Sequence, residues 1–348
     1  MTGEQMKAVR LTGPRRLELV ETEIPKPDGH HVIIRVSTCG ICGSDLHYWE
    51  SGLDMSGAPG LILGHEFCGT VHDPGSRNDL SPQDRVTALP LDPCETCESC
   101  AAGHPNLCTR GMKRSIPGNN GPGAYAQYLK VRPDMVRRLP DGIDDCEAAM
   151  IEPAAVALHA VRKAGVRAGD RVLVCGGGAI GLLCASWAGI SGASCVALTE
   201  VNALRRAFAQ EIGVADVVFD ALEPRLVSLM KKTLQGGFDI ALETSASENG
   251  INTAISALRP CGRLVLAGIS FRPQAVMTVL QVVKEIDQRS SLGYLPGEFD
   301  QAMDYIARKR LDVQRLVNRN IGLDAVQDAF EHLSSAACAD VKVLIRVA

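Results

Sequence analysis

Short apolar runs and alternating apolar–polar runs fill the first third of the chain. Residues 6–10, 17–21 and 31–37 form such runs, and glycine and proline residues between positions 13 and 29 separate them. Alternation with a period of two, broken by glycine and proline, is typical of β-strands. Further strands are predicted at 84–86 and 124–131, with a loop over 71–83. The N-terminal region is therefore predicted to be rich in β-structure.

The pattern changes after an apolar run at 150–160, which predicts a buried helix. Strands are then predicted at 171–175, 194–198, 217–219, 240–243 and 264–267, and helices at 182–190, 222–234 and 250–258. Apolar strands that alternate with helices indicate a parallel, doubly wound sheet. The last part of the chain predicts helices at 298–308 and 323–333 and a strand at 341–347.

Length and composition are consistent with two globular domains. The chain has 348 residues, of which 46% are hydrophobic and 22% charged. The net charge of −4 gives no reason to expect nucleic acid or an anionic membrane as a partner. No signal peptide or membrane-length apolar run is recognisable, so we expect a cytoplasmic protein. Thirteen cysteines in a reducing compartment favour metal binding or packing over disulfides.

A first candidate metal site lies in the stretch 39–47. Cys42 is a soft ligand suited to zinc, and Ser44, Asp45 and His47 follow it closely. Alone, this could be a reduced, buried cysteine beside a surface histidine. Further ligands occur downstream, however: His65 and Glu66 after an apolar run, and Glu152 at the start of the predicted helix. Asp45 could accept the second N–H of His65, which would fix its tautomer. The alternatives are a core histidine and a glutamate that stabilises a helix N-terminus.

A second candidate metal site has four cysteines at short spacing: Cys94, Cys97, Cys100 and Cys108. Four thiolates can enclose a tetrahedral ion and leave no free coordination position. The alternative is a set of reduced surface cysteines, which this spacing disfavours. We therefore expect a structural zinc in a lobe over residues 90–112, where the metal would replace a hydrophobic core.

A dinucleotide-binding signature lies between the predicted strand at 171–175 and the helix after it. Gly176, Gly178 and Gly181, with Ile180 in the same turn, match G-x-G-x-x-G and would let a pyrophosphate approach the helix N-terminus. Glu200 ends the next strand and favours NAD, because a 2′-phosphate would face a like charge. Arg205 lies nearby and could instead accept such a phosphate. The nicotinamide is expected at later strand ends, near Thr244, Gly268 and Ile269.

Together these motifs, in this order, resemble the zinc-containing medium-chain alcohol and polyol dehydrogenases over essentially the whole chain. The resemblance implies that Cys42 and His65 bind a catalytic zinc, and that Glu66 and Glu152 complete or exchange in its shell. It implies a proton relay through Ser44 and His47, and a structural zinc at the four cysteines. It also implies a β-rich GroES-like catalytic domain (1–155 and 291–348), interrupted by a Rossmann NAD-binding domain (156–290), in a homodimer or homotetramer.

Within that family, Glu152-Pro153 stands where simple alcohol dehydrogenases have a cysteine ligand. In this feature the chain resembles the polyol, 2,3-butanediol and threonine dehydrogenase branch. Gln83 and the stretch 289–294 depart from the usual pattern. We expect NAD-dependent oxidation of a secondary alcohol, in a polyol or vicinal diol, to a ketone. The alternatives are oxidation of a 3-hydroxy amino acid such as threonine, and a non-catalytic scaffold that binds zinc and nucleotide.

Overall fold

The computed structural model describes residues 4–335 and 337–347. The chain forms two compact units: the first comprises Met1–Glu152 and Leu295–Ala348, and the second Pro153–Tyr294. Helix α4 (Ile151–Ala164) carries the chain from one to the other. Among the described residues, no helix combines the length and apolar character needed to cross a membrane. All thirteen cysteines are free thiols.

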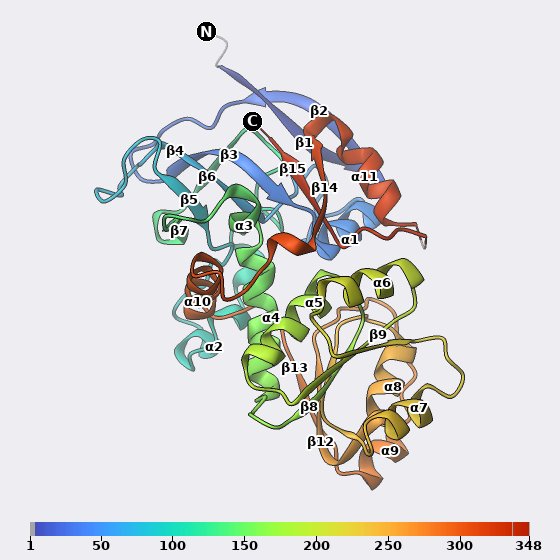
Figure 1. The fold of residues 1–348 in the computed structure, drawn as a ribbon. Helices are drawn as coiled ribbons and strands as arrows, with labels where there is room; N and C mark the ends of the chain where they lie inside the picture. Colours follow the sequence, from blue (N-terminus) through green and yellow to red (C-terminus); the bar gives the residue numbers. More distant parts are fainter. Residues whose placement is uncertain (1–3, 336, 348) are drawn as a thin grey trace. The chain divides into compact units, whose positions relative to one another are not determined.

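The first unit is built on a sheet in which the last strand of the chain lies beside an early one. The strand order is β14-β15-β3-β4-β5-β7, and β6 also pairs with β3. β15 runs antiparallel to β3 with Leu344 opposite Gly40, so red and blue strands neighbour each other in Figure 1. The strands are β3 (Val32–Gly40), β4 (Glu66–Asp73), β5 (Arg85–Ala88), β6 (Tyr128–Val131), β7 (Val136–Arg138), β14 (Val317–Gly322) and β15 (Lys342–Arg346).

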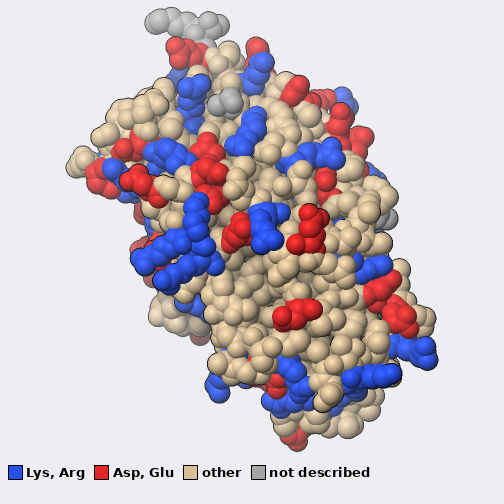
Figure 2. Space-filling view, in the orientation of Figure 1, with Lys and Arg blue, Asp and Glu red and all other residues tan. Residues whose placement is uncertain are grey.

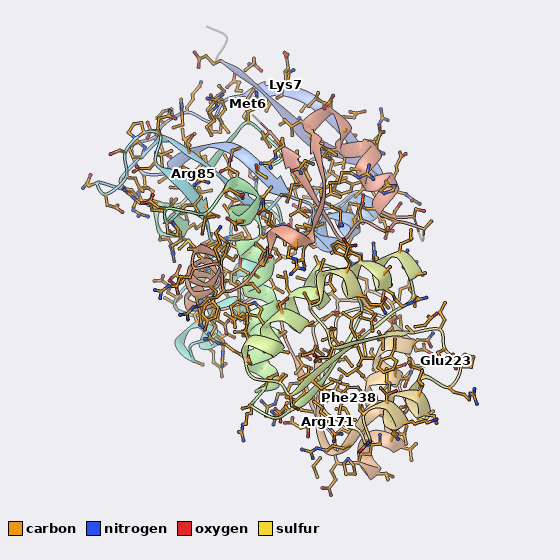
Figure 3. The ribbon with its side chains drawn as sticks, viewed as in Figure 1. Met6, Lys7, Arg85, Arg171, Glu223 and Phe238 are labelled. Atoms are coloured by element: carbon orange, nitrogen blue, oxygen red, sulfur yellow. The ribbon has the colours of Figure 1, made fainter. Side chains whose placement is uncertain are left out.

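A separate antiparallel pair, β1 (Gln5–Gly13) and β2 (Arg16–Glu23), adds to this unit. Met6 and Lys7 on β1 show its period of two, because Met6 is buried and Lys7 is exposed (Figure 3). The helices of the unit are α1 (Gly43–Ser51), α2 (Glu98–Ala101), α3 (Asp145–Ala149), α10 (Pro296–Ala307) and α11 (Val326–Leu333). Short 3₁₀ turns occupy Pro105–Leu107, Gly111–Lys113, Pro133–Met135, Gln314–Leu316 and Leu323–Ala325.

Aromatic side chains tie the N-terminal and C-terminal parts of the first unit together. Phe330 on α11 meets the rings of Trp49 at 5.9 Å and Tyr125 at 6.2 Å, both edge-on. All three side chains are buried. Helix α1 is thereby fixed against α11, which determines where Cys42 and Asp45 lie.

The second unit is a six-stranded parallel sheet of order β10-β9-β8-β11-β12-β13. The first strand, β8, lies in the middle and later strands add to either side, so the predicted doubly wound Rossmann arrangement is confirmed. Phe238, at the start of β11, is fully buried (Figure 3). The elements are β8 (Arg171–Cys175), α5 (Ala179–Ile190), β9 (Cys195–Glu200), α6 (Ala203–Ile212), β10 (Val217–Asp220), α7 (Leu226–Thr233), β11 (Phe238–Glu243), α8 (Glu248–Ala257), β12 (Leu258–Leu266), α9 (Thr278–Val283) and β13 (Asp287–Ser290).

Charged side chains of both signs are interspersed over the face shown in Figure 2. Ion pairs join the C-terminal segment of the first unit to its N-terminal part. Arg137 lies 2.9 Å from Asp300, and Lys309 lies 2.6 Å from Glu147. The second pair involves a buried carboxylate, which needs such a partner in a poorly solvated position.

Several local predictions differ from the structure. The loop predicted over 71–83 is wrong at its start, because β4 extends to Asp73. The pattern also missed helix α1 and the strands β13 and β14. Strands β13 and β14 are mostly exposed and polar, so they lack the apolar run or alternation that reveals a strand.

Candidate active site

Cys42 is held at the point where β3 has ended and α1 begins. It is the N-cap residue of α1, and Asp45 at the third helical position accepts a 2.9 Å hydrogen bond from the Cys42 amide. Ser44 and His47 lie three residues apart on the same helix; Ser44 is half-buried and His47 is exposed.

The pairing of β3 with β4 brings the other candidate ligands to Cys42. Gly40 at the end of β3 is opposite Glu66 at the start of β4. As a result, the ligand atoms of Cys42, His65 and Glu66 all lie within 4.8 Å of one another. His65 and Glu66 are buried, and Cys42 is half-buried. Cys42 and His65, which are 23 positions apart in the sequence, therefore belong to one ligand set with Glu66. This set combines a soft sulfur ligand with nitrogen and oxygen ligands, as zinc accepts.

The surroundings of His65 fit a bound metal. His65 Nδ1 and Asp45 Oδ1 are 3.6 Å apart, and both are buried without a hydrogen-bond partner. The other oxygen of Asp45 accepts a 2.9 Å hydrogen bond from the Tyr125 hydroxyl. A metal-binding histidine directs one ring nitrogen to such a carboxylate and leaves the second for the metal. The residues present therefore fit a zinc ion bound through the other nitrogen of His65.

The charges around His65 favour a positive charge at this point. Burial opposes protonation of His65, but the nearby Asp45 and Cys42 outweigh it and raise its pKa well above the ordinary value. For Asp45, burial has the opposite effect and raises the pKa. Glu152, half-buried in the first turn of α4, contributes to the negative potential at His65. It is not among the residues whose ligand atoms lie within 4.8 Å of one another.

A lysine that the motifs did not predict borders the same cluster. Lys342 on β15 is buried, and its ammonium pairs with Glu66 Oε2 and donates to the Ile41 carbonyl at 3.1 Å. Burial lowers the pKa of Lys342, but the charges of Glu66 and Cys42 outweigh burial and raise it overall. Lys342 therefore places a buried, paired basic group beside the ligand set.

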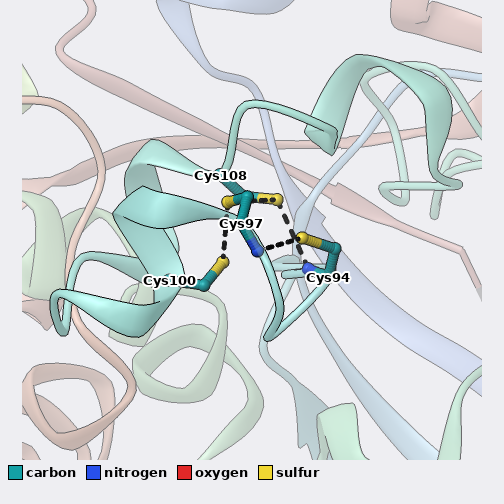
Figure 4. A group of neighbouring side chains, drawn as sticks. All are labelled: Cys94, Cys97, Cys100 and Cys108. Atoms are coloured by element: carbon teal, nitrogen blue, oxygen red, sulfur yellow. Dashed lines mark hydrogen bonds between the residues drawn. The ribbon is translucent and has the colours of Figure 1, made fainter.

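The four cysteines form a second, separate cluster (Figure 4). Their sulfur atoms all lie within 4.8 Å of one another, and Cys97 Sγ is 3.4 Å from Cys100 Sγ and 4.0 Å from Cys108 Sγ. A tetrahedral zinc with Zn–S bonds of about 2.3 Å places its sulfurs ~3.8 Å apart. Backbone amides point at the sulfurs: Cys97 N lies 3.3 Å from Cys94 Sγ. The spacing of the four sulfurs therefore fits a site that encloses a zinc ion and leaves no free coordination position.

The pKa values of two of these thiols are shifted in opposite directions. Hydrogen bonds from the backbone of Cys100 and Thr109 lower the pKa of Cys97 to about 5, whereas desolvation raises the pKa of Cys100 to about 12. Cysteine binds a metal as the thiolate, so the thiols that are still protonated release protons as they bind it.

In the second unit, the glycines of the fingerprint are required by close packing. Gly176 has φ +111° beside Thr244, and the Thr244 hydroxyl donates a 2.9 Å hydrogen bond to the Cys175 carbonyl. A Cβ on Gly181 would collide with the Gly176 carbonyl and lie 2.9 Å from Thr244 Oγ1. Gly178 is the N-cap of α5, and Ile180 is half-buried in its first turn. The loop can therefore present backbone amides to a phosphate.

Glu200 ends β9 next to this loop. Its carboxylate accepts hydrogen bonds from the Gly177 amide at 2.7 Å and the Asn202 amide at 2.8 Å. Arg205 is half-buried in the first turn of α6, the helix that follows β9. Each carboxylate oxygen has a further lone pair, so Glu200 can hold the glycine loop and still accept a ribose hydroxyl.

The other residues expected near the nicotinamide follow the ends of β11 and β12. Thr244 comes directly after β11, and Gly268 and the exposed Ile269 follow β12. A Cβ on Gly268 would lie 2.5 Å from the Ala246 amide nitrogen. The buried Glu243 orders this region, because it accepts hydrogen bonds from the Ser245 amide at 2.8 Å and the Ala246 amide at 3.2 Å.

Comparison with known proteins agrees with these sites. The chain matches the Alcohol dehydrogenase GroES-like domain over residues 28–141 and the Zinc-binding dehydrogenase family over residues 179–308. It is 34% identical to sorbitol dehydrogenase of Bos taurus, covering 96% of this chain and 94% of that protein.

Two solved structures are similar over the whole chain. The 2R,3R-butanediol dehydrogenase of Bacillus subtilis superimposes with a TM-score of 0.88 at 27% identity, covering 99% of this chain and 100% of that one. A zinc-binding dehydrogenase of Sinorhizobium meliloti 1021 bound to NADP gives 0.88 at 29% identity, covering 99% of both chains. The predicted GroES-like and Rossmann fold class is confirmed, and the chain belongs to the zinc-containing medium-chain alcohol and polyol dehydrogenase family.

Proposed function

We propose that this enzyme oxidises a secondary alcohol in a polyol or vicinal diol to the ketone and transfers the hydride to NAD. The observation that carries the proposal is the mixed cluster of Cys42, His65 and Glu66, with Asp45 facing His65. A site with few protein ligands retains a coordination position for substrate. Relatives named for sorbitol and 2,3-butanediol support a substrate with neighbouring hydroxyl groups.

Cys42, His65 and either Glu66 or Glu152 would hold the catalytic zinc. Zinc bound there supplies a Lewis acid that makes a substrate hydroxyl more acidic. Ser44 can accept the hydroxyl proton, because a serine accepts and donates within one hydrogen-bonded chain. His47, exposed on the same face of α1, can pass the proton on to solvent.

We assign the first unit as the catalytic domain and the second as the cofactor domain. Cys94, Cys97, Cys100 and Cys108 would hold the structural zinc. The glycine loop would hold the cofactor pyrophosphate, and Thr244, Gly268 and Ile269 would lie near the nicotinamide. Glu200 favours NAD over NADP because a 2′-phosphate would meet its charge, while Arg205 is the residue that could reduce this preference.

The enzyme is expected to act in the cytoplasm as a homodimer, or as a tetramer built from it. The second unit offers a suitable surface: β13 is the edge strand of its sheet, and Val282 and Val283 on the preceding α9 are about three-quarters exposed (75% and 74%). An open strand edge beside apolar side chains favours pairing with a second copy. Sedimentation of the wild type and of Val283→Asp, which should lower the mass to the monomer's, tests this.

A substrate panel tests the proposed reaction. Sorbitol, xylitol, 2,3-butanediol, threonine and a primary alcohol are each supplied with NAD, and NADH formation is measured. The proposal predicts the highest kcat/KM with a polyol or diol. A preference for threonine would support the 3-hydroxy amino acid reaction instead. If the protein binds zinc and NAD but forms no NADH with any substrate, the result would support a non-catalytic scaffold that binds zinc and nucleotide.

A further inference from the structure

A third group of metal-binding side chains lies in the C-terminal segment of the first unit and shares no residue with the two sites described above. It comprises His332, Cys338 and Asp340, whose ligand atoms all lie within 4.8 Å of one another. These residues supply an imidazole nitrogen, a sulfur and a carboxylate oxygen, which are the three kinds of ligand that zinc accepts in proteins. The group therefore has the composition of a zinc site.

Each member of the group is held by a different part of the fold. His332 lies in the last turn of α11, and Asp340 lies two residues before β15. Cys338 lies between them, and its amide donates a 3.0 Å hydrogen bond to the Ser335 carbonyl. Arg319 on β14 holds Asp340, with Arg319 Nε 2.7 Å from Asp340 Oδ2. A helix end, a turn and the approach to a strand thus converge on one point.

The group is buried on one side and open to solvent on the other. Cys338 is 2% exposed, whereas the side chains of Asp340 and His332 are 14% and 43% exposed. His332 Nε2 and Asp340 Oδ2 are 3.2 Å apart. A tetrahedral zinc bonded at about 2.0–2.1 Å to nitrogen and oxygen places these atoms ~3.4 Å apart. Both atoms therefore need to move little to bind one ion that enters from solvent.

Arg319 is the group with which an ion must share Asp340. Its guanidinium also lies 3.5 Å from His332 Nε2. An ionised carboxylate has two oxygens with about four acceptor positions, so Asp340 can bind a metal and keep Arg319 as a partner. The charge of Arg319 opposes a nearby cation, while the partial negative charge at the C-terminal end of α11 favours one. The site should therefore bind zinc less tightly than the four-cysteine site does.

We propose that His332, Cys338 and Asp340 bind a further zinc ion, reversibly and in addition to the catalytic and structural zinc. Three protein ligands leave a coordination position for water. The bound ion joins the end of α11 to the start of β15. Because α11 packs through Phe330 on the N-terminal part of the unit and β15 pairs with β3, the ion stabilises the return of the chain to the first unit. This role is independent of alcohol oxidation.

Equilibrium dialysis against zinc tests the site. The wild type is first dialysed against metal-free buffer without a chelator and then against micromolar zinc chloride. Total zinc should rise by one ion per chain, and the thermal midpoint should rise with the zinc concentration because the ion binds the folded state. In Cys338→Ala and in His332→Gln the affinity for this ion should fall by more than about 10-fold, since even loss of an outer-shell partner costs 10–100-fold.

Two matched variants control for adsorption of zinc elsewhere. Cys261→Ala removes an exposed thiol of the second unit, and His72→Gln removes an exposed histidine of the first. Both should take up the additional zinc as the wild type does. Cobalt then identifies the sulfur ligand, because Co(II) added to the zinc-filled wild type should give a thiolate-to-cobalt charge-transfer absorption that Cys338→Ala lacks.

The exposed side chain of His332 keeps the test decisive if the buried Cys338→Ala fails to fold. The proposal is overturned if the zinc content of the wild type does not rise during the second dialysis. It is also overturned if His332→Gln, or folded Cys338→Ala, binds the additional zinc as tightly as the wild type, because the zinc is then an adventitious ion only.

Discussion

The candidate zinc ligands are oriented by side chains that lie behind them. Asp45 faces His65 with one oxygen, and its other oxygen accepts hydrogen bonds from the Cys42 amide and the Tyr125 hydroxyl. Asp45 thus links two ligands, and Tyr125 fixes Asp45. Buried networks of this kind depend on every member being satisfied.

Tyr125→Phe should weaken the catalytic zinc site and leave the fold intact. The change removes one hydrogen bond to Asp45, and loss of such outer-shell partners costs about 10–100-fold in metal affinity or activity. Zinc retained after dialysis against a chelator measures the effect. Tyr128→Phe, which alters a tyrosine beside His72 instead, is the matched control. Equal zinc retention in the two variants would show that the Tyr125 hydroxyl is unimportant.

Glu200→Gln should reduce the preference for NAD. The amide keeps the shape of the side chain and an acceptor oxygen for the Gly177 amide, but it removes the charge that a 2′-phosphate would face. We expect the ratio of kcat/KM for NAD to that for NADP to fall by about tenfold, equivalent to ~1.4 kcal/mol. Glu223→Gln, a half-buried acid of the second unit that lies outside the glycine loop (Figure 3), is the control. Comparable use of both cofactors by the wild type would contradict the assignment.

Asp28 should make stability depend on pH in the acid range. The Lys130 ammonium, 2.8 Å away, and the backbone amides of His30 and His31 hold the pKa of Asp28 well below its usual value. A carboxyl whose pKa is lowered by folding stabilises the protein above its unfolded pKa of about 4, and this contribution is lost as the pH falls further. Asp28→Asn should therefore lower the thermal midpoint at pH 7, and the difference should shrink below about pH 4. A difference that is independent of pH would refute the electrostatic explanation.

At the scale of elements, the four-cysteine lobe has little regular structure of its own. It contains only the short helix α2 and a 3₁₀ turn between Cys94 and Cys108. Cys97→Ser should remove one zinc per chain and lower the thermal midpoint by about 5 °C or more, since structural zinc contributes several kcal/mol to folding. Cys195→Ser, a half-buried thiol outside both clusters, should do neither. Full zinc content in Cys97→Ser would exclude the proposed site.

The elements that could be predicted are those whose side chains face a core. The strands β1, β2, β3 and β8 were located because buried and exposed positions alternate or because the strand is buried throughout. Helix α1 was missed because Gly40 and Gly43 suggested a turn, and because only Asp45 and Trp49 on it are buried. A buried aspartate carries no hydrophobic signal, although this one organises the candidate site.

At the scale of the whole molecule, some contacts could not be predicted from motifs. Cys42, His65 and Glu66 were predicted because each lies in a recognisable local pattern. Lys342 has no such pattern, and it meets Glu66 across 276 positions of sequence. Tyr125 likewise reaches Asp45 from 80 positions away. The Lys342 contact depends on β15 pairing with β3 after the whole second unit has intervened in the sequence.

The most direct test of the central claim measures zinc per chain and polyol-dependent NADH formation, in the wild type and in Cys42→Ser. We expect two zinc ions and turnover in the wild type. We expect one zinc and no turnover in Cys42→Ser, with the four-cysteine site still filled. Wild-type turnover in Cys42→Ser, or an active wild-type enzyme that holds fewer than two zinc ions, would contradict it.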